Sequence, residues 1–466
     1  MAEADRQHVQ PDRNQPIGRG WDRTGDYVLY WMQASQRAEW NHALEYAIAQ
    51  ANQRSVPVVA CFGLTDGYPQ ANARHYLFML QGLSQTSRRL ADRGVQLVVR
   101  KGHPPQVAAD LAGAAGLVVV DRGYLRHQRT WRKDLAEQVE AQVVQVESDV
   151  VVPIETASNK EEYAARTIRP KIHRHLEDYL VQIEPAKPGR DSLDLDLGGL
   201  DVSDPQALLD QLDVDVSVAP SRLYPGGRSE AERLLAEFSE QKLSRYADER
   251  SEPGEDIQSH MSPFLHFGQI SPLEIALRVR QADARQEAKD AFLEELIVRR
   301  ELGINFVAYN SHYDSYAHLP EWAQATLEYH KHDDRENLYT AEQLEKAQTH
   351  DEYWNAAMRE MVVTGKMHNY MRMYWGKKII EWSNTPQQAY RTALELNNRY
   401  FLDGRDPLSF SNVAWLFGKH DRPWQERAIF GKVRYMNAAG LERKFDMKAY
   451  LDRVEALIGR QEGGEE

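Results

Sequence analysis

Short apolar runs alternate with longer amphipathic stretches over the first third of the chain. The apolar runs lie at residues 27–32, 56–62, 95–100 and 116–121, and a fifth is expected within 142–152. Two intervening stretches, 36–52 and 72–93, have the spacing of helices. Val-rich strands that alternate with helices are typical of a parallel sheet covered on both faces. The pattern predicts an α/β domain at 25–152, doubly wound around a five-stranded parallel sheet, after a polar leader at 1–24.

A polar, acidic stretch and then a long helical region follow this domain. Residues 184–215 hold nine acidic side chains against only Lys187 and Arg190, which indicates a crossover linker within 153–227. From residue 228 onwards helical patterns dominate, and capping boxes are expected to begin at Ser271, Thr340 and Thr349. The sequence therefore predicts a large all-α domain at 228–460 and a short tail at 461–466.

Cysteine content and hydropathy narrow the cellular setting. The single cysteine, Cys61, allows no internal disulfide and no thiolate cluster, which suits a reducing compartment. No apolar run reaches the roughly 20 residues that span a bilayer, and the first residues are too polar for a secretory signal. We expect a cytoplasmic protein with no membrane contact, no bound metal and no obligate protein partner.

Charge is distributed unevenly along the chain. The net charge of −13 argues against unspecific nucleic-acid binding by the whole surface. Residues 359–448, however, contain 16 Lys and Arg against 9 Asp and Glu, so this region is basic and the remainder is strongly acidic. A local excess of cations fits a phosphate-binding surface, although a merely solvated face would have the same composition.

Two common nucleotide-binding classes are disfavoured. No GxGxxG follows the first apolar run, and no GxxxxGK[ST] occurs in the chain. Neither a dinucleotide-dependent dehydrogenase nor a P-loop enzyme is therefore expected. The carboxyl ends of the parallel strands could still hold a small ligand.

The most distinctive stretch is 361–382, which reads MVVTGKMHNYMRMYWGKKIIEW. Gly365 can end one helix, and the following residues predict a second helix from about Lys366 to Trp382. Trp375 and Trp382 then lie two turns apart, roughly 10 Å by helical rise. That separation suits electron transfer between indoles, but aromatic residues at helical spacing also form ordinary cores.

Two further stretches carry candidate polar chemistry. Within 246–271, Ser259 and Ser262 precede short helical starts, and their hydroxyls and free amides suit a pyrophosphate unless they are simple caps. Within 292–306, Glu295 lies among apolar residues, where a carboxyl must be paired or protonated. The alternative is a salt-bridged helix surface that includes Arg299 and Arg300.

Two polar regions complete the set of candidates. Residues 395–418 combine amides, carboxylates and glycines, which suits hydrogen bonding to a heteroaromatic ring, although an ordinary polar loop contains the same residue types. Residues 419–437 alternate cations with aromatic side chains. That pattern fits a nucleic-acid strand with an unstacked base or, alternatively, a cation-rich interdomain contact.

Together these stretches resemble the class II cyclobutane pyrimidine dimer photolyases of the photolyase and cryptochrome superfamily. The motifs are YWM at 30–32, SHMSPFLHFGQIS at 259–271, EELIVRRE at 294–301, KMHNYMRMYWGKKIIEW at 366–382, DGRDP at 403–407 and NVAWLFGKHDRPW at 412–424. The resemblance covers about residues 25–450. It implies light-dependent DNA repair, in which reduced FAD in the helical domain donates an electron to a flipped-out dimer, splits it and regains the electron. It also implies that the α/β domain could hold a deazaflavin or folate antenna.

The resemblance assigns roles to individual residues. FAD contacts are implied for Tyr246, Ser259, Met261, Ser262, Leu265, Arg372, Asp403 and Gly404. Contacts with the dimer or its flanking phosphates are implied for Glu295, Met373, Trp415, Arg422 and Arg434. Asn397 would lie near the reactive flavin nitrogen. Trp375, Trp354 and Trp382 would form a proximal, middle and surface step of an electron path.

Two departures and two rival activities stay open at this stage. Ser251-Glu252-Pro253 stands where the family commonly has Asn-Asp-Pro, which leaves one polar contact near the flavin open. Gln33–Gln36 stands where an acidic, Arg-rich turn is common, which weakens the case for an antenna. A cryptochrome-like photoreceptor without repair activity, or a (6-4) photolyase, would share the fold. In a prokaryote, DNA binding would associate the protein with the nucleoid.

Overall fold

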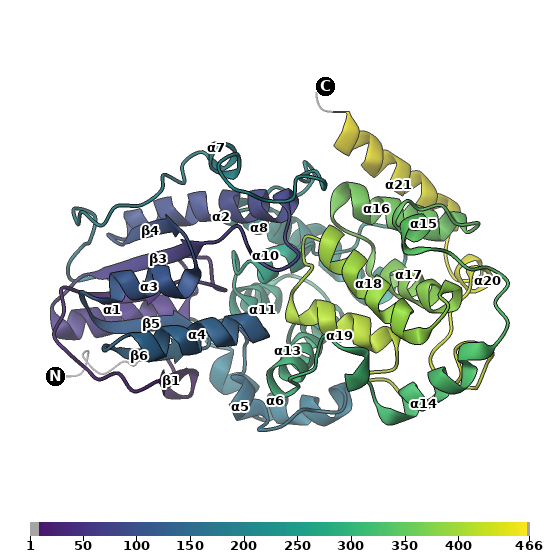
Figure 1. The fold of residues 1–466 in the computed structure, drawn as a ribbon, viewed down its shortest axis with the longest axis horizontal. Helices are drawn as coiled ribbons and strands as arrows, with labels where there is room; N and C mark the ends of the chain where they lie inside the picture. Colours follow the sequence, from purple (N-terminus) through teal and green to yellow (C-terminus); the bar gives the residue numbers. More distant parts are fainter. Residues whose placement is uncertain (1–8, 464–466) are drawn as a thin grey trace.

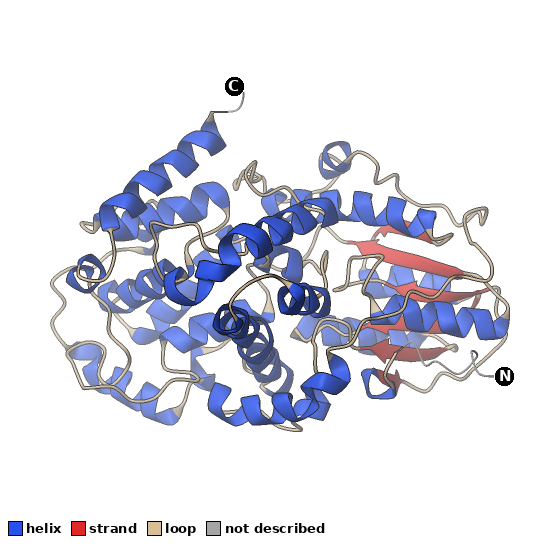
Figure 2. Ribbon diagram, turned by 180° about the vertical axis from the view of Figure 1, so that it is seen from behind, coloured by secondary structure: helices blue, strands red, loops and turns tan. Residues whose placement is uncertain are grey.

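The computed structural model describes residues 9–463, and residues 1–8 of the predicted leader and 464–466 of the predicted tail lie outside the described residues. An α/β part and a helical part lie side by side (Figure 1). The strands of the described chain all lie in the first part, and helices with their connections form the second (Figure 2). The predicted fold class is confirmed.

A six-stranded sheet, ordered β1-β6-β5-β2-β3-β4, forms the α/β part. Its strands are β1 (Asn14–Ile17), β2 (Tyr27–Trp31), β3 (Val58–Leu64), β4 (Gln96–Lys101), β5 (Ala115–Asp121) and β6 (Gln142–Val146). The last five are parallel, as predicted, and all side chains of β2, β3 and β5 are buried. The sequence analysis does not predict β1, which lies within the expected leader and pairs antiparallel with β6.

Helices cover both faces of this sheet. α1 (His42–Arg54) packs on one face, and α3 (Pro104–Ala112) and α4 (Arg126–Gln138) pack on the other. α2 (Ala73–Asp92) packs against the end of β3 and β4. The doubly wound arrangement is the predicted one.

The acidic linker covers one edge of the sheet. It contains α5 (Ile154–Ala157), α6 (Ala165–Tyr179) and α7 (Pro205–Leu209). Its extended part follows β4, where the Leu200 amide donates to the Val99 carbonyl at 2.7 Å. Close by, the Ser192 hydroxyl accepts from the Gln96 amide at 2.8 Å. Covering an edge strand blocks its pairing with other chains, so this segment does more than span two domains.

The second part is almost wholly helical. Its α-helices are α8 (Arg228–Glu237), α9 (Tyr246–Glu249), α10 (Ser262–His266), α11 (Pro272–Gln281), α12 (Gln286–Leu293), α13 (Arg300–Tyr309), α14 (Glu321–Tyr329), α15 (Ala341–Glu345), α16 (Glu352–Thr364), α17 (Asn369–Trp382), α18 (Pro386–Tyr400), α19 (Pro407–Leu416), α20 (Ala438–Glu442) and α21 (Met447–Glu462). Two π-helices lie at Phe238–Lys242 and Glu294–Arg299. Within residues 9–463, no helix is both long and apolar enough to cross a bilayer.

The predicted helix caps are only partly correct. Thr340 forms the expected reciprocal box at α15. Ser271 caps α11, but Glu274 forms a buried ion pair with another helix instead of completing the box. Thr349 does not cap α16: the helix starts at Glu352, and the N-cap is Asp351, whose side chain accepts from the Trp354 amide at 2.9 Å.

α17 begins three residues later than predicted. Gly365 ends α16 with a φ of 83°, a left-handed conformation that favours glycine. The chain then needs Lys366, Met367 and His368 to turn, and His368 caps α17 by accepting from the Tyr370 amide at 3.2 Å. The two helices therefore meet at a tight corner.

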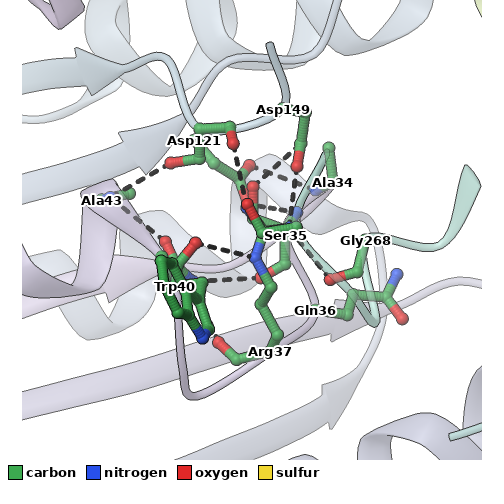
Figure 3. A network of polar contacts seen from close by, with 12 residues as sticks. Ala34, Ser35, Gln36, Arg37, Trp40, Ala43, Asp121, Asp149 and Gly268 are labelled. Atoms are coloured by element: carbon green, nitrogen blue, oxygen red, sulfur yellow. Dashed lines mark hydrogen bonds and ion pairs between the residues drawn. The ribbon is translucent and has the colours of Figure 1, made fainter. Parts of the chain in front are cut away.

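A buried polar network fastens the two parts together (Figure 3). The Arg37 guanidinium binds the Asp149 carboxylate at 2.8 Å and donates to the Gly268 carbonyl of the helical part at 3.0 Å. Gly268 has a φ of 64°, and a side chain there would collide with the Ala34 carbonyl oxygen. Asp121 accepts from the backbone amides of residues 33–35. The turn after β2 is thus held firmly against the helical part.

Candidate functional site

An ion pair between α17 and the loop after α18 forms the centre of the candidate cofactor region. The Arg372 guanidinium donates to both carboxylate oxygens of Asp403, at 2.9 and 3.1 Å, and lies 3.7 Å from the centre of the Phe401 ring. Burial alone would raise the pKa of Asp403. Arg372, Lys366 and a hydrogen bond with Ser262 outweigh burial and hold that pKa below its usual value. Asp403 is therefore ionised at neutral pH.

A second cation faces the same carboxylate. The Lys366 ammonium lies 5.4 Å from the centre of the Tyr224 ring, and within residues 9–463 it forms no ion pair with a carboxylate. Burial lowers the pKa of Lys366 to about 8, while the charge of Asp403 opposes that change. The charges of Asp256 and Glu360 act on Lys366 in the same direction as that of Asp403, so this cluster combines the cations Lys366 and Arg372 with several carboxylates.

Close backbone contacts shape the loop that carries Asp403. Asn397 is buried and donates to the Asn398 side chain at 3.1 Å, and Asn398 also accepts from the Arg405 amide at 3.0 Å. A side chain at Gly404 would come within 2.8 Å of the carbonyl oxygens of Asn397 and Phe401. Glycine is thus required there, and the loop packs Gly404 against the end of α18 that carries Asn397.

The serines of α10 do not act as the predicted caps. Met261, and not Ser262, occupies the N-cap position of α10, which has only five residues. The Ser262 side chain bonds to Asp403, whereas the Ser259 hydroxyl accepts from the Met261 amide at 3.4 Å. Ser262 therefore joins the Arg372–Asp403 cluster through its side chain. The alternative that Ser262 is a simple helix cap therefore does not hold.

Glu295 projects from the π-helix Glu294–Arg299 and binds the Arg250 guanidinium at 3.1 Å. Its side chain is 41% exposed, so of the two arrangements that the sequence leaves open the structure has the salt-bridged surface, with Arg250 as the partner. Burial first, and then the charge of Glu295, raises the pKa of the neighbouring Tyr246 to about 12. Tyr246 thus lies beside Glu295. The sequence analysis does not identify Arg250 as a partner of this carboxylate.

Three indoles extend away from the Arg372 cluster. Phe401, which contacts Arg372, lies 6.4 Å from the Trp375 ring. The Trp354 indole donates to the Trp375 carbonyl at 2.9 Å, and its ring lies 5.5 Å from that of Trp382. All three indoles are almost fully buried, with exposed fractions of 2% or less.

The surface position expected for Trp382 is wrong. The segment between α14 and α16 covers it, since the Tyr339 amide donates to the Trp382 carbonyl at 3.2 Å. The rings of Tyr339 and His350 pack edge-on against the indole at 5.3 and 5.4 Å. Tyr339 and His350 therefore separate the Trp382 indole from solvent.

Cations and indoles alternate in a column beside α19. Along the column, Lys377 lies 5.5 Å from the Trp415 ring, Arg434 lies 5.1 Å from Trp415 and 4.3 Å from Trp424, and Arg422 lies 5.3 Å from Trp424. Each guanidinium or ammonium thus faces an aromatic ring, a geometry that is favourable in itself. Arg422, Trp424 and Arg434 of the 419–437 stretch are thus in direct contact in the column.

The two ends of this column differ in exposure. Lys377 is fully buried and donates to the Leu416 carbonyl at the end of α19, and burial lowers its pKa to about 7. At the other end Trp424 is 39% exposed and Arg422 is exposed. Met373, on α17, is half-buried. The sequence analysis does not identify Lys377 as part of this surface.

A cavity of about 120 Å³ lies between the carboxyl ends of the strands and the helical part. Its aromatic lining comes from Trp31, Phe62, Tyr68, Tyr76 and Trp131, and the helical part adds Leu265, His266, Phe267 and Arg405. The Trp31 indole nitrogen and the whole Gln33 carboxamide are buried there without a hydrogen-bond partner among the described residues. Buried polar groups of this kind can pair with water or with a bound ligand. Leu265 therefore lies at this cavity.

Relatives of the chain share both its length and its sequence. It is 52% identical over 437 residues to a deoxyribodipyrimidine photo-lyase of Methanothermobacter thermautotrophicus, which covers 94% of this chain and 96% of the relative. It is 38% identical to the protein of that name from Arabidopsis thaliana, over 97% of this chain and 94% of the relative. The DNA photolyase family model matches residues 28–189.

Solved structures show the same fold at low sequence identity. A class III photolyase from Agrobacterium tumefaciens has a TM-score of 0.72 at 18% identity and covers 93% of this chain and 87% of that one. An archaeal photolyase from Sulfolobus tokodaii, solved with two FAD molecules, has a TM-score of 0.69 at 19% identity, over 91% and 88%. With relatives this similar over nearly its whole length, the chain belongs to the DNA photolyase family.

Proposed function

We propose that this chain repairs cyclobutane pyrimidine dimers in DNA in a light-dependent reaction, and that it is of the class II type. The observation that carries the proposal is the arrangement of the Arg372–Asp403 pair, the half-exposed Glu295 and the Trp375 path within one helical part. The long relatives named deoxyribodipyrimidine photo-lyase support the activity. The motifs at 259–271 and 366–382 support the class.

The residues around Asp403 fit FAD. Lys366 and Arg372 supply the positive charge that a diphosphate needs, and the ionised Asp403 can accept a hydrogen bond from a ring N–H. Asn397 adds a carboxamide in the same loop. When bound, reduced FAD would act as the light-driven electron donor. The chain's own residues bind it, orient it and set the charge around it.

The column beside α19 fits the damaged strand. Trp415 offers a partly buried ring for the flipped-out dimer, and Arg422 and Arg434 offer guanidinium groups to the flanking phosphates. Trp424, exposed between the two guanidiniums, is placed to fill the gap that a flipped base leaves.

Glu295 and Arg250 act as a pair in this scheme. Arg250 binds one carboxylate oxygen of Glu295, so the other oxygen is available to the dimer. Negative charge that develops on the dimer would be stabilised by the nearby guanidinium, while the carboxyl group fixes the orientation of the dimer. No covalent bond to the protein is needed.

The cavity of the α/β part fits an antenna. A planar heterocycle with an amide edge would pack between the aromatic side chains and pair with the Gln33 carboxamide and the Trp31 N–H. Gln33 departs from the turn that is common in the family, but its carboxamide in this cavity, which has no hydrogen-bond partner among the described residues, favours a bound antenna. Both a deazaflavin and a folate have such an edge.

The decisive experiment uses two lesions. Purified protein with reduced FAD is illuminated with an oligonucleotide that contains one thymine cyclobutane dimer, and separately with one that contains a (6-4) photoproduct. We expect restored thymines only from the cyclobutane dimer. Repair of the (6-4) lesion alone would replace the proposal with that rival activity, and repair of neither would favour a photoreceptor.

A further inference from the structure

The linker segment 160–166, which reads KEEYAAR, turns its acidic side chains inward. Glu161 binds Lys419 and accepts from the Asn310 side chain at 2.9 Å. Glu162 is 3% exposed and binds Lys171 and the Ser158 hydroxyl. The Lys171 ammonium and the hydroxyl outweigh partial burial and lower the pKa of Glu162 to about 2. Each carboxylate is paired with a lysine of the protein, so the two repel an approaching anion only weakly.

The other side chains of this segment face outward. Lys160 and Arg166 are exposed and, within the described chain, neither forms an ion pair, while Tyr163 is 50% exposed. The backbone beneath them is fixed, because the Asn305 side chain accepts from the Glu162 amide at 2.8 Å and donates to the Lys160 carbonyl at 3.0 Å. The result is a firmly held strip with two free cations and a phenol.

This strip adjoins both candidate contacts with the lesion. The His420 ring donates to the Tyr163 carbonyl at 2.8 Å, and the Tyr163 hydroxyl donates to the Asp421 carbonyl at 3.4 Å. Asp421 also holds Arg434 in the column. Further along α6, which lies with α5 beneath α13 in Figure 1, Arg169 binds Glu294, the neighbour of Glu295, at 2.6 Å. The strip therefore continues the surface that begins at the column.

We propose that Lys160, Tyr163 and Arg166 form an extension of the DNA-binding surface that contacts backbone phosphates of the duplex flanking the lesion. This inference rests on the proposed function, since it assumes that the lesion binds at the column. Two cations that form no ion pair within residues 9–463, on an otherwise acidic protein, complement a phosphate backbone. Such contacts position the duplex and are independent of its sequence.

The test is the salt dependence of DNA binding. Fluorescence anisotropy gives the Kd of the wild type and of the Lys160→Gln/Arg166→Gln double variant for a dimer-containing duplex at several salt concentrations. Loss of two phosphate contacts should reduce the slope of log K against log salt by about 1.8. Arg88→Gln, which removes an exposed cation on α2, is the matched control and should keep the wild-type slope.

A trimmed substrate locates the contact. Two shorter duplexes are used, one trimmed on each side of the dimer. With one of them, the wild type and the double variant should have the same salt slope. Equal slopes for wild type, double variant and control would overturn the inference, and so would a difference that survives both trimmings. If the slopes differ as expected but light restores no thymines in the wild type, the proposed function fails while the DNA-binding strip stands.

Discussion

Replacement of Glu301 by Gln should stabilise the protein increasingly as the pH rises. Glu301, on α13, is 3% exposed and accepts from the backbone amides of Val151 and Val152, at 2.6 and 3.4 Å, where the linker leaves the sheet. Its second carboxylate oxygen is buried without a hydrogen bond from the described residues. Burial outweighs these amides and the nearby Arg300 and raises the pKa of Glu301 from 4.5 to about 8.

The sign and size of the effect follow from linkage. Because the folded-state pKa lies above the unfolded value, the protonated group stabilises the fold fully below about pH 4.5. That contribution is lost as the pH rises through about 8. At 1.36 kcal/mol per pH unit, the whole interval corresponds to about 5 kcal/mol and the part above pH 6 to about 3 kcal/mol. In the Glu301→Gln variant, the neutral carboxamide can still accept from the two amides and escapes this loss.

Urea denaturation of both proteins between about pH 6 and pH 8.5 measures the difference. The variant should gain on the wild type by about 3 kcal/mol over that range and then stay level. Glu294→Gln is the control. Although burial alone would raise the pKa of Glu294, ion pairs with Arg169 and Arg299 lower it, so its contribution is already complete at pH 6. A difference between Glu301→Gln and wild type that does not change with pH would refute the reasoning.

Four shorter predictions concern the site and its surroundings. Glu295→Gln should lower the repair yield while FAD stays bound, as an absorbance spectrum and a repair assay would show together. Trp375→Phe should slow photoreduction of oxidised flavin far more than repair by pre-reduced enzyme, and equal losses would mean structural damage. Lys377→Met should weaken binding of dimer-containing DNA by about 1 kcal/mol, roughly fivefold, because the column loses its buried cation. Hydrogen bonds with Glu426 and Asp333 raise the pKa of His330 above 6.5. The loss of stability in His330→Gln should therefore be greatest below about pH 6.5 and should shrink as the pH rises through the raised pKa.

Much of the fold is predictable because the local signals are strong. Continuous Val-rich runs form the five parallel strands, and Gly365 ends a helix in the expected place. β1 escapes prediction because Asn14–Ile17 is a short, polar strand that contains Pro16. Proline is acceptable there only because the strand lies at the edge of the sheet, and no sequence pattern indicates that edge position.

The site is less predictable because its contacts are long-range. Arg372 and Asp403 lie 31 residues apart, and only the family resemblance pairs them. The apolar neighbours of Glu295 leave open whether it is buried, whereas on the π-helix Glu294–Arg299 it is half-exposed and its partner is Arg250, 45 residues earlier in the chain. The family resemblance implies a surface position for Trp382, whereas a segment earlier in the chain covers it.

Light-driven splitting of a defined dimer tests the central claim most directly. The protein, with its flavin chemically reduced, is mixed with an oligonucleotide that carries one thymine cyclobutane dimer, and restored thymines are counted by chromatography after blue light and after an equal time in darkness. The account predicts restoration in the light, none in the dark, and loss of the reaction when Arg372 and Asp403 are replaced together and FAD is no longer held. Equal restoration in light and darkness, or none in either, would contradict it.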